Sequence, residues 1–169
     1  DRVRVKGTRA LTTLLTSKAT AITSVGLGIV AGGGSRDAPL SAEEAAEVGK
    51  WCEHGGLTSF VSTYHLYEDE GVDELMRAIA SSSTLEELEL VDKERTEKFA
   101  DGLGVVVGGS KTITRMKLTH DGVPMHGGEA VARALGKNGT LTELDCGGSK
   151  DWSAAAVRAL GESLEGKNT

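Results

Sequence analysis

The sequence is short of aromatic residues, of cysteines and of long apolar runs. Aromatic residues make up 4% of the 169 residues, and only two cysteines are present. No apolar run reaches the ~18 residues that a membrane-spanning helix needs, so we expect no membrane span. The formal net charge of −6 argues against a nucleic-acid partner, because such proteins neutralise phosphates with Lys and Arg. A core of Leu, Val, Ile and Ala remains possible.

Motifs that carry chemistry are also missing from the sequence. Gly108-Gly109-Ser110-Lys111 has Ser and Lys in the reverse of the order found in a phosphate-binding loop. His120 and His126 flank Asp121 with no thiol nearby, whereas a zinc site usually has three or four nitrogen or sulfur ligands, so we interpret them as surface histidines. No Ser or Cys stands in a nucleophile motif. We therefore predict no catalytic residue, metal or cofactor, and no enzyme.

The two cysteines lie in distant parts of the chain. A disulfide needs Cα atoms within ~7 Å, so we predict that Cys52 and Cys146 are free thiols. Free thiols favour a reducing compartment, and we expect a cytoplasmic location, with a secreted or surface location as the alternative. Asn138-Gly139-Thr140 matches the N-glycosylation sequon, a triplet that also occurs by chance.

What the chain does contain is a repeated motif with apolar residues at positions 1, 4 and 6. Its first positions, Leu85, Ile113 and Leu141, are 28 residues apart, and a weaker copy begins 28 residues earlier at Leu57. A step of this size is typical of stacked repeats. Polar residues at positions 3, 5 and 7 give the period of two that marks a strand with one buried face. The predicted strand motifs lie at 22–27, 57–62, 85–90, 113–118 and 141–146.

A helix follows each motif. Apolar pairs spaced by four residues recur six and ten residues before the next motif, and that spacing puts each pair on one helix face. The pairs are Leu75/Ile79, Leu103/Val107 and Val131/Leu135, with Leu160/Leu164 after the last motif. The predicted helices cover 72–80, 98–107, 128–135 and 154–164, and another begins at Ser41, where Glu44 completes a capping box. Trp51 aligns with Ile79 and is predicted to be core.

The motifs and helices together resemble the leucine-rich repeat family, in its ribonuclease-inhibitor-like subtype. The resemblance implies an α/β fold: a right-handed β/α solenoid with a parallel sheet on the concave side and helices on the convex side. It implies a single domain over residues 1–169 with about five units. Both ends lack polar caps, so we expect a truncated piece of a longer array, or ends that pair with a further molecule, which includes end-to-end self-association of this chain. The family usually has Asn three residues after position 6, where this chain has His65, Lys93, Asp121 and Ser149.

The exposed positions 3 and 5 predict rows of side chains across the sheet. Neighbouring strands are ~4.8 Å apart, so Arg115 should lie between Glu87 and Glu143, and Lys117 between Glu89 and Asp145. One interpretation is a stabilising charge ladder. The other is a partner-binding surface, because the concave faces of solenoids bind proteins. The candidate binding residues are Ser59, Val61, Thr63, Tyr64, Glu87, Glu89, Val91, Arg115, Lys117, Thr119, His120, Glu143 and Asp145.

The function expected from these features is non-enzymatic: a protein-protein interaction or scaffolding module that binds a partner protein through the concave face. The alternative is regulatory, since the subtype resembles the repeats of Ran GTPase-activating protein and of NOD-like immune sensors. No residue of this sequence maps onto a catalytic Arg or Asn of that activator, so the alternative rests on the fold alone.

Overall fold

The computed structural model describes residues 2–5, 22–28, 41–54, 56–63, 69–91, 97–119, 125–146 and 153–165. Strands and helices alternate along these ranges. The strands are β1 (Arg2–Val5), β2 (Ser24–Gly28), β3 (Ser59–Thr63), β4 (Glu87–Val91), β5 (Arg115–Thr119) and β6 (Glu143–Asp145). The helices are α2 (Ala42–His54), α3 (Asp69–Ser81), α4 (Glu97–Gly109), α5 (Met125–Leu135) and α6 (Ala154–Glu165). The turn positions His65, Lys93, Asp121 and Ser149 lie outside the described residues.

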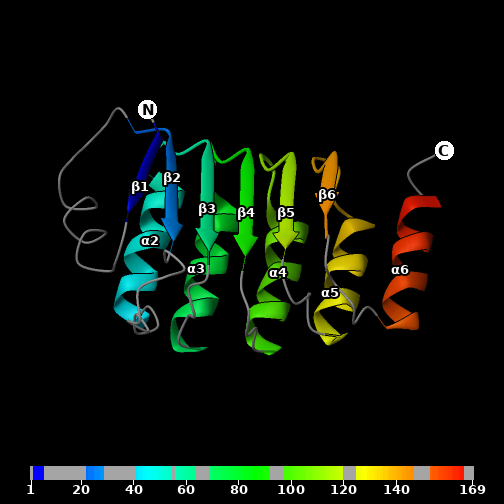
Figure 1. The fold of residues 1–169 in the computed structure, drawn as a ribbon. Coiled ribbons are helices and arrows are strands. Elements are labelled where there is room, and N and C mark those ends of the chain that lie inside the picture. The colour runs from blue at the N-terminus through cyan, green and yellow to red at the C-terminus, as the bar shows by residue number, and fades with distance from the viewer. Residues whose placement is uncertain are drawn as a thin grey trace.

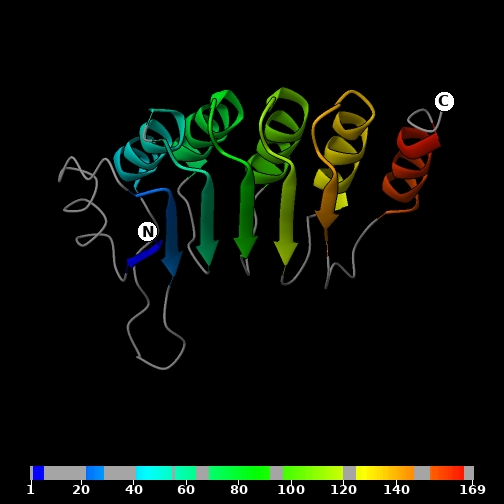
Figure 2. The ribbon, with the colours of Figure 1, turned by 90° about the horizontal axis from the view of Figure 1, so that it is seen from above.

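The strands form one parallel sheet in chain order, from β1 to β6 (Figure 1). Helices α2 to α6 lie side by side on one face of this sheet and leave the other face open (Figure 2). Figure 2 also shows the helices spread more widely than the strands, so the sheet lines the concave side. The crossovers through helices α2, α3, α4 and α5 are right-handed, as such connections almost always are (Figure 1). The predicted right-handed β/α solenoid is confirmed.

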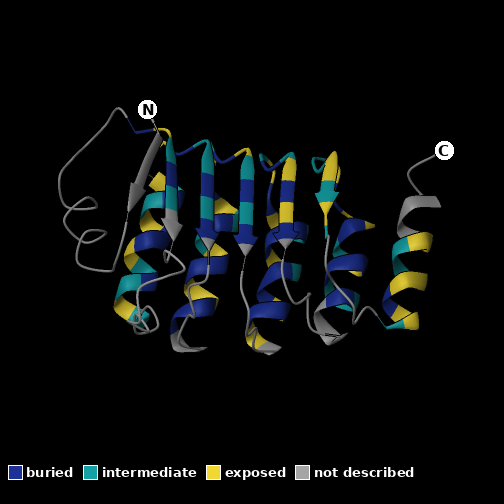
Figure 3. Cartoon of the chain, in the orientation of Figure 1, coloured by how far each residue is buried: buried dark blue, intermediate teal, exposed yellow. Residues whose placement is uncertain are grey.

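The core is a continuous column between the sheet and the helices. Position 1 of the motif is buried at Leu57, Leu85 and Ile113, all at most 1% exposed. Position 4 is buried in register on successive strands, at Val25, Phe60, Leu88 and Met116. Leu141 and Leu144 are only partly buried, because β6 is the edge strand of the sheet. Figure 3 shows the same alternation of buried and exposed residues along the strands. The first positions of the motifs therefore stack in the core as predicted, and they are less buried at β6.

Helix α4 forms even though its glycines and valines have poor helix propensity. A Cβ added at Gly102 would lie 2.5 Å from the Cγ of Met76 in α3, and one added at Gly104 would lie 3.1 Å from the Cβ of Ala130 in α5. The glycines thus let α4 approach both neighbouring helices closely. Burial of Leu103 and Val107 outweighs the propensity cost, as the repeat predicted.

Helix α2 begins at the predicted capping box. The Ser41 amide donates to Glu44 Oε2 at 3.0 Å, and the Glu44 amide donates to Ser41 Oγ at 3.3 Å. The prediction of a core Trp51 is off by one residue: Cys52 is fully buried, and Trp51 is only partly buried. Cys52 lies five positions before Leu57, whereas Ile79 lies six positions before Leu85, so the connection from α2 to β3 is one residue shorter.

Three buried polar side chains, three residues before successive motifs, hold the entries to β4, β5 and β6. Ser82 Oγ and Ser110 Oγ each accept hydrogen bonds from the two backbone amides that open the next motif. Asn138 Oδ1 accepts the same pair, from Thr140 and Leu141, both at 2.7 Å. Its Nδ2 donates to the carbonyl of Val107, and Asn138 is 4% exposed. This nitrogen is the atom a glycan would need, so the folded sequon at Asn138 is a structural cap and not an acceptor.

Candidate functional site

Positions 3 and 5 of each motif point away from the helices, onto what we call the open face. Position 3 is Ser24, Ser59, Glu87, Arg115 and Glu143 on successive strands from β2 to β6, and position 5 is Gly26, Val61, Glu89, Lys117 and Asp145. The register pairs these residues position by position across the sheet. The predicted rows are thus present, and the order along each row from β4 to β6 is acid, base, acid.

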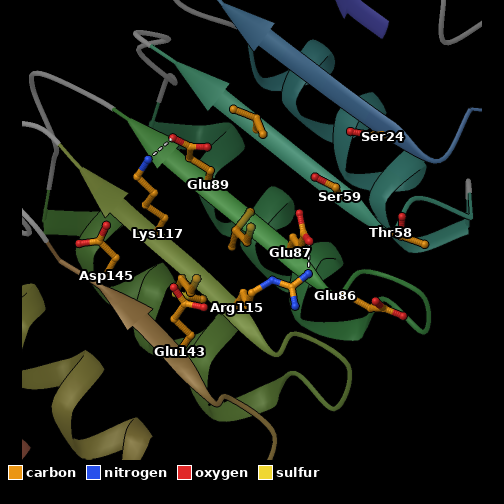
Figure 4. Close-up of a pocket in the computed structure, with 13 residues that line it drawn as sticks. Ser24, Thr58, Ser59, Glu86, Glu87, Glu89, Arg115, Lys117, Glu143 and Asp145 are labelled. Atoms are coloured by element: carbon orange, nitrogen blue, oxygen red, sulfur yellow. Dashed lines mark hydrogen bonds and ion pairs between the residues drawn. The ribbon is translucent and has the colours of Figure 1, made fainter. Parts of the chain in front are cut away.

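The charged part of the open face is an ordered ladder. Arg115 Nη2 binds Glu87 Oε1, and Lys117 Nζ lies 3.1 Å from Glu89 Oε1 (Figure 4). These four side chains are between 32% and 52% exposed, so solvent screens the pairs. The hydrogen bond and charge of Glu87 raise the pKa of the Arg115 guanidinium, and the charge of Glu143 adds to this. The contacts orient the side chains more than they stabilise the fold.

A groove of about 420 Å³ crosses the open face from β2 to β6. Where it lies over β2 and β3, its lining consists of the short side chains of Ser24, Ser59 and Val61, each half-buried. We call this part the β3 hollow. The longer side chains of Glu87 and Glu89 line the groove next to it on β4 (Figure 4). Five carboxylates and two cationic groups line the whole groove, and these are Glu86, Glu87, Glu89, Glu143, Asp145, Arg115 and Lys117.

The structure brings most of the predicted binding residues together. Those that line the groove are Ser59, Val61, Glu87, Glu89, Arg115, Lys117, Glu143 and Asp145. Thr63, Val91 and Thr119 end β3, β4 and β5, and the structure does not describe their side chains. Tyr64 and His120 lie outside the described residues. The strand positions 3 and 5 thus lie along one groove, while their role in binding and the extension of the surface into the loops stay predictions.

Five groove residues were absent from the predicted set, and these are Ser24, Thr58, Glu86, Leu88 and Met116. Thr58 and Glu86 occupy position 2 of the motif. In every motif except that of Glu86, position 2 is a threonine. The hydroxyls of Thr58, Thr114 and Thr142 donate to the backbone of the preceding repeat. Glu86 breaks that series and is exposed, which was the sequence signal that could have found it.

The groove has the chemistry of a recognition surface. Its carboxylates alternate with cations along the rows, and within the described ranges no three His, Cys, Asp or Glu side chains gather as a metal site would require. Cys52 and Cys146 are free thiols, as predicted, and both lie away from the groove lining. None of the helices that the structure describes is long and apolar enough to cross a membrane.

The stacked strand-helix units, with a parallel sheet on the concave side, define a leucine-rich-repeat solenoid. The sequence matches no protein-family model and no curated protein. Among solved structures, leiomodin-1 actin-binding site 2 is similar with a TM-score of 0.57 and 12% identity, over 94% of this chain and 90% of that chain. The tropomodulin C-terminal domain of Caenorhabditis elegans has a TM-score of 0.48 and 13% identity, over 99% of this chain and 84% of that chain. At these identities the likeness concerns the fold alone.

Proposed function

We propose that this chain is a non-enzymatic protein-binding module that takes its partner on the open face of the sheet. The observation that carries the proposal is the groove itself, which crosses five strands and is lined by ordered charged residues. No described helix covers this face (Figure 2). Five parallel strands span roughly 19 Å at the usual strand spacing, which is wide enough for a peptide segment.

The chemistry of the groove favours a protein over other partners. Its excess of carboxylates would repel a phosphate backbone. A small-molecule site is usually enclosed and mainly apolar, whereas this groove is open and bordered by charged side chains. Charged rims of this kind steer association and select partners. The two free thiols suit a reducing, cytoplasmic setting for such a module.

The test is affinity capture with charge-reversed variants, followed by identification of the captured protein. We expect Arg115→Glu with Lys117→Glu to change capture at least about tenfold, because reversal inverts the ladder and removes the cations that orient Glu87 and Glu89. The matched control reverses Arg77 and Arg158, which are exposed on helices α3 and α6. Thermal melts confirm that both variants are folded. Capture that survives in the ladder variant and equals the control would remove the open face from the function.

The regulatory alternative is addressed by a separate measurement. Acceleration of GTP hydrolysis by candidate small GTPases would replace the scaffold proposal with that of a GTPase-activating module. We also propose that residues 1–169 form a single repeat domain of the ribonuclease-inhibitor-like subtype. Its β6 end leaves Leu141, Leu144 and Leu160 partly buried, which favours end-to-end self-association. A molar mass that rises with concentration in light scattering would support such association, and a constant monomer mass would refute it.

A further inference from the structure

We propose that the partner inserts cationic side chains into the β3 hollow, beside Glu87 and Glu89. This inference rests on the proposed function and specifies the chemistry of the partner. The occupant is an extended segment with Lys or Arg at alternate positions. Charge order, side-chain geometry and strand spacing each support it.

The alternation of acidic and basic side chains across the sheet ends at β4, and β3 has no charged residue at positions 3 and 5. Arg115 has an acidic residue on both sides in the register, Glu87 on β4 and Glu143 on β6. Glu87 has Arg115 on one side, but on the other side its register partner is Ser59. The second row repeats the arrangement, with Glu89 between Lys117 and the uncharged Val61. The place where the next cationic column would stand is the β3 hollow.

Glu87 and Glu89 are oriented so that each could bind a second cation above β3. Each uses Oε1 to bind the cation on β5, and Figure 4 shows the other carboxylate oxygen turned toward the β3 side. Among the described residues, neither of these second oxygens has a hydrogen-bond partner. The Glu87 and Glu89 side chains remain 46% and 32% exposed. Ser59 on β3 is one strand spacing, ~4.8 Å, from Glu87 on β4, and Arg115 on β5 is the same spacing away on the other side. A cation above Ser59 would therefore be as well placed to bind Glu87 as Arg115 is.

The local charge balance supports a cationic occupant. The two cations on β5 leave the five carboxylates of the groove in excess by three. Two added cations above β3 would bring the groove close to neutrality and give each β4 glutamate a positive neighbour on both sides. Val61 and Ser59 on the floor of the hollow offer a partly buried surface for the methylene stem of Lys or Arg.

The spacing of the two rows sets the pattern of the segment. Positions 3 and 5 are two residues apart along a strand, which is about 6.8 Å. Residues i and i+2 of an extended chain have the same separation and lie on one face. A segment running along β3 can therefore place one cation at Glu87 and the next at Glu89. Lysines clustered at one end of a segment would engage fewer rows.

The test uses a fluorescein-labelled synthetic peptide with Lys and Thr in strict alternation, and measures its binding to the full chain by anisotropy at low salt. We expect Glu87→Gln with Glu89→Gln to weaken binding about fivefold, from two exposed ion pairs lost together. The matched control, Glu74→Gln with Glu162→Gln, makes the same change of net charge at exposed positions on α3 and α6 and should bind like the unaltered chain. A peptide with the same composition but all lysines in one block should bind more weakly.

Three results would overturn the inference. They are no binding of the alternating peptide, equal weakening in the two double variants, and equal affinity for the block peptide. These outcomes are separable from failure of the proposed function. A captured partner that is lost with Arg115→Glu and Lys117→Glu, but retained with Glu87→Gln and Glu89→Gln, would keep the open face as a binding surface and exclude the β3 hollow from it.

Discussion

The open face has two halves that share a backbone and differ in their side chains. Over β2 and β3 its outward residues are small and uncharged, and over β4, β5 and β6 they are charged, with ion pairs between β4 and β5. Beneath both halves the inward residues are buried to the same degree, with Phe60 under the first and Leu88 under the second, each 1% exposed. One set of motif positions therefore maintains the repeat, and a different set varies from strand to strand on the open face.

The largest expected difference is in the reaction rates of the two cysteines, Cys52 in α2 and Cys146 after β6. Cys52 in α2 is fully buried, and burial raises the pKa of its thiol to about 12. Cys146 follows β6 and is only partly buried. Because the thiolate is the reactive form, the raised pKa and the burial of Cys52 together should slow its modification by orders of magnitude near pH 8. Ellman's reagent should titrate one thiol per native chain rapidly and the second only after denaturant is added.

Replacing one cysteine at a time shows which of the two gives the rapid reaction. Cys146→Ser should leave no rapidly reacting thiol in the native chain, and Cys52→Ser should leave the rapid phase unchanged. The raised pKa also predicts the direction of the pH effect: the stability contributed by the buried neutral thiol is complete below the ordinary thiol pKa and is lost as the pH rises toward 12. Rapid modification of Cys52 would mean that the interior behind β2 and β3 is open.

The next largest effect is a loss of stability, and it is expected from core substitutions under either half of the open face. Phe60→Ala under the β3 hollow should lower the free energy of unfolding by about 4 kcal/mol, and Leu88→Ala under the ladder by about 3 kcal/mol, since each leaves a cavity in a packed core. Urea unfolding measures both. Val105→Ala, at a residue that is 48% exposed on α4, is the control and should change the same free energy by less than about 0.5 kcal/mol. A loss confined to one half would mean that the halves do not share a core.

Sequence periodicity was sufficient for the repeat and its interior. Leu103 and Val107 predicted helix α4 correctly against its glycines, because burial on a repeating face outweighs local propensity. Periodicity failed where a connection changes length by one residue, and so it assigned to Trp51 the core position that Cys52 fills.

The two rows of the open face were predictable for the same reason as the core: a strand alternates its faces. The β3 hollow was not. It arises from the difference in size between Ser59 and its register partner Glu87, residues that are 28 positions apart and become neighbours only in the sheet. The exposed Glu86 was missed because the predicted rows included only positions 3 and 5.

The smallest expected effect comes from turning the first half into a copy of the second. Ser59→Lys puts a cation beside Glu87 within the chain itself, so the midpoint of thermal unfolding should rise by about 1 °C at low salt and return to the original value near 1 M salt. Ser24→Lys is the matched control, because the register partners of Ser24 are Arg2 on β1 and Ser59 on β3, so no carboxylate is gained. Ser59→Lys should also displace the alternating peptide, because its lysine lies directly beside Glu87, whereas the lysine of Ser24→Lys lies one strand further away and leaves the position beside Glu87 accessible. Equal shifts in the two variants would show that the cation acts on the net charge of the chain, and the distinction between the two halves would then have no electrostatic basis.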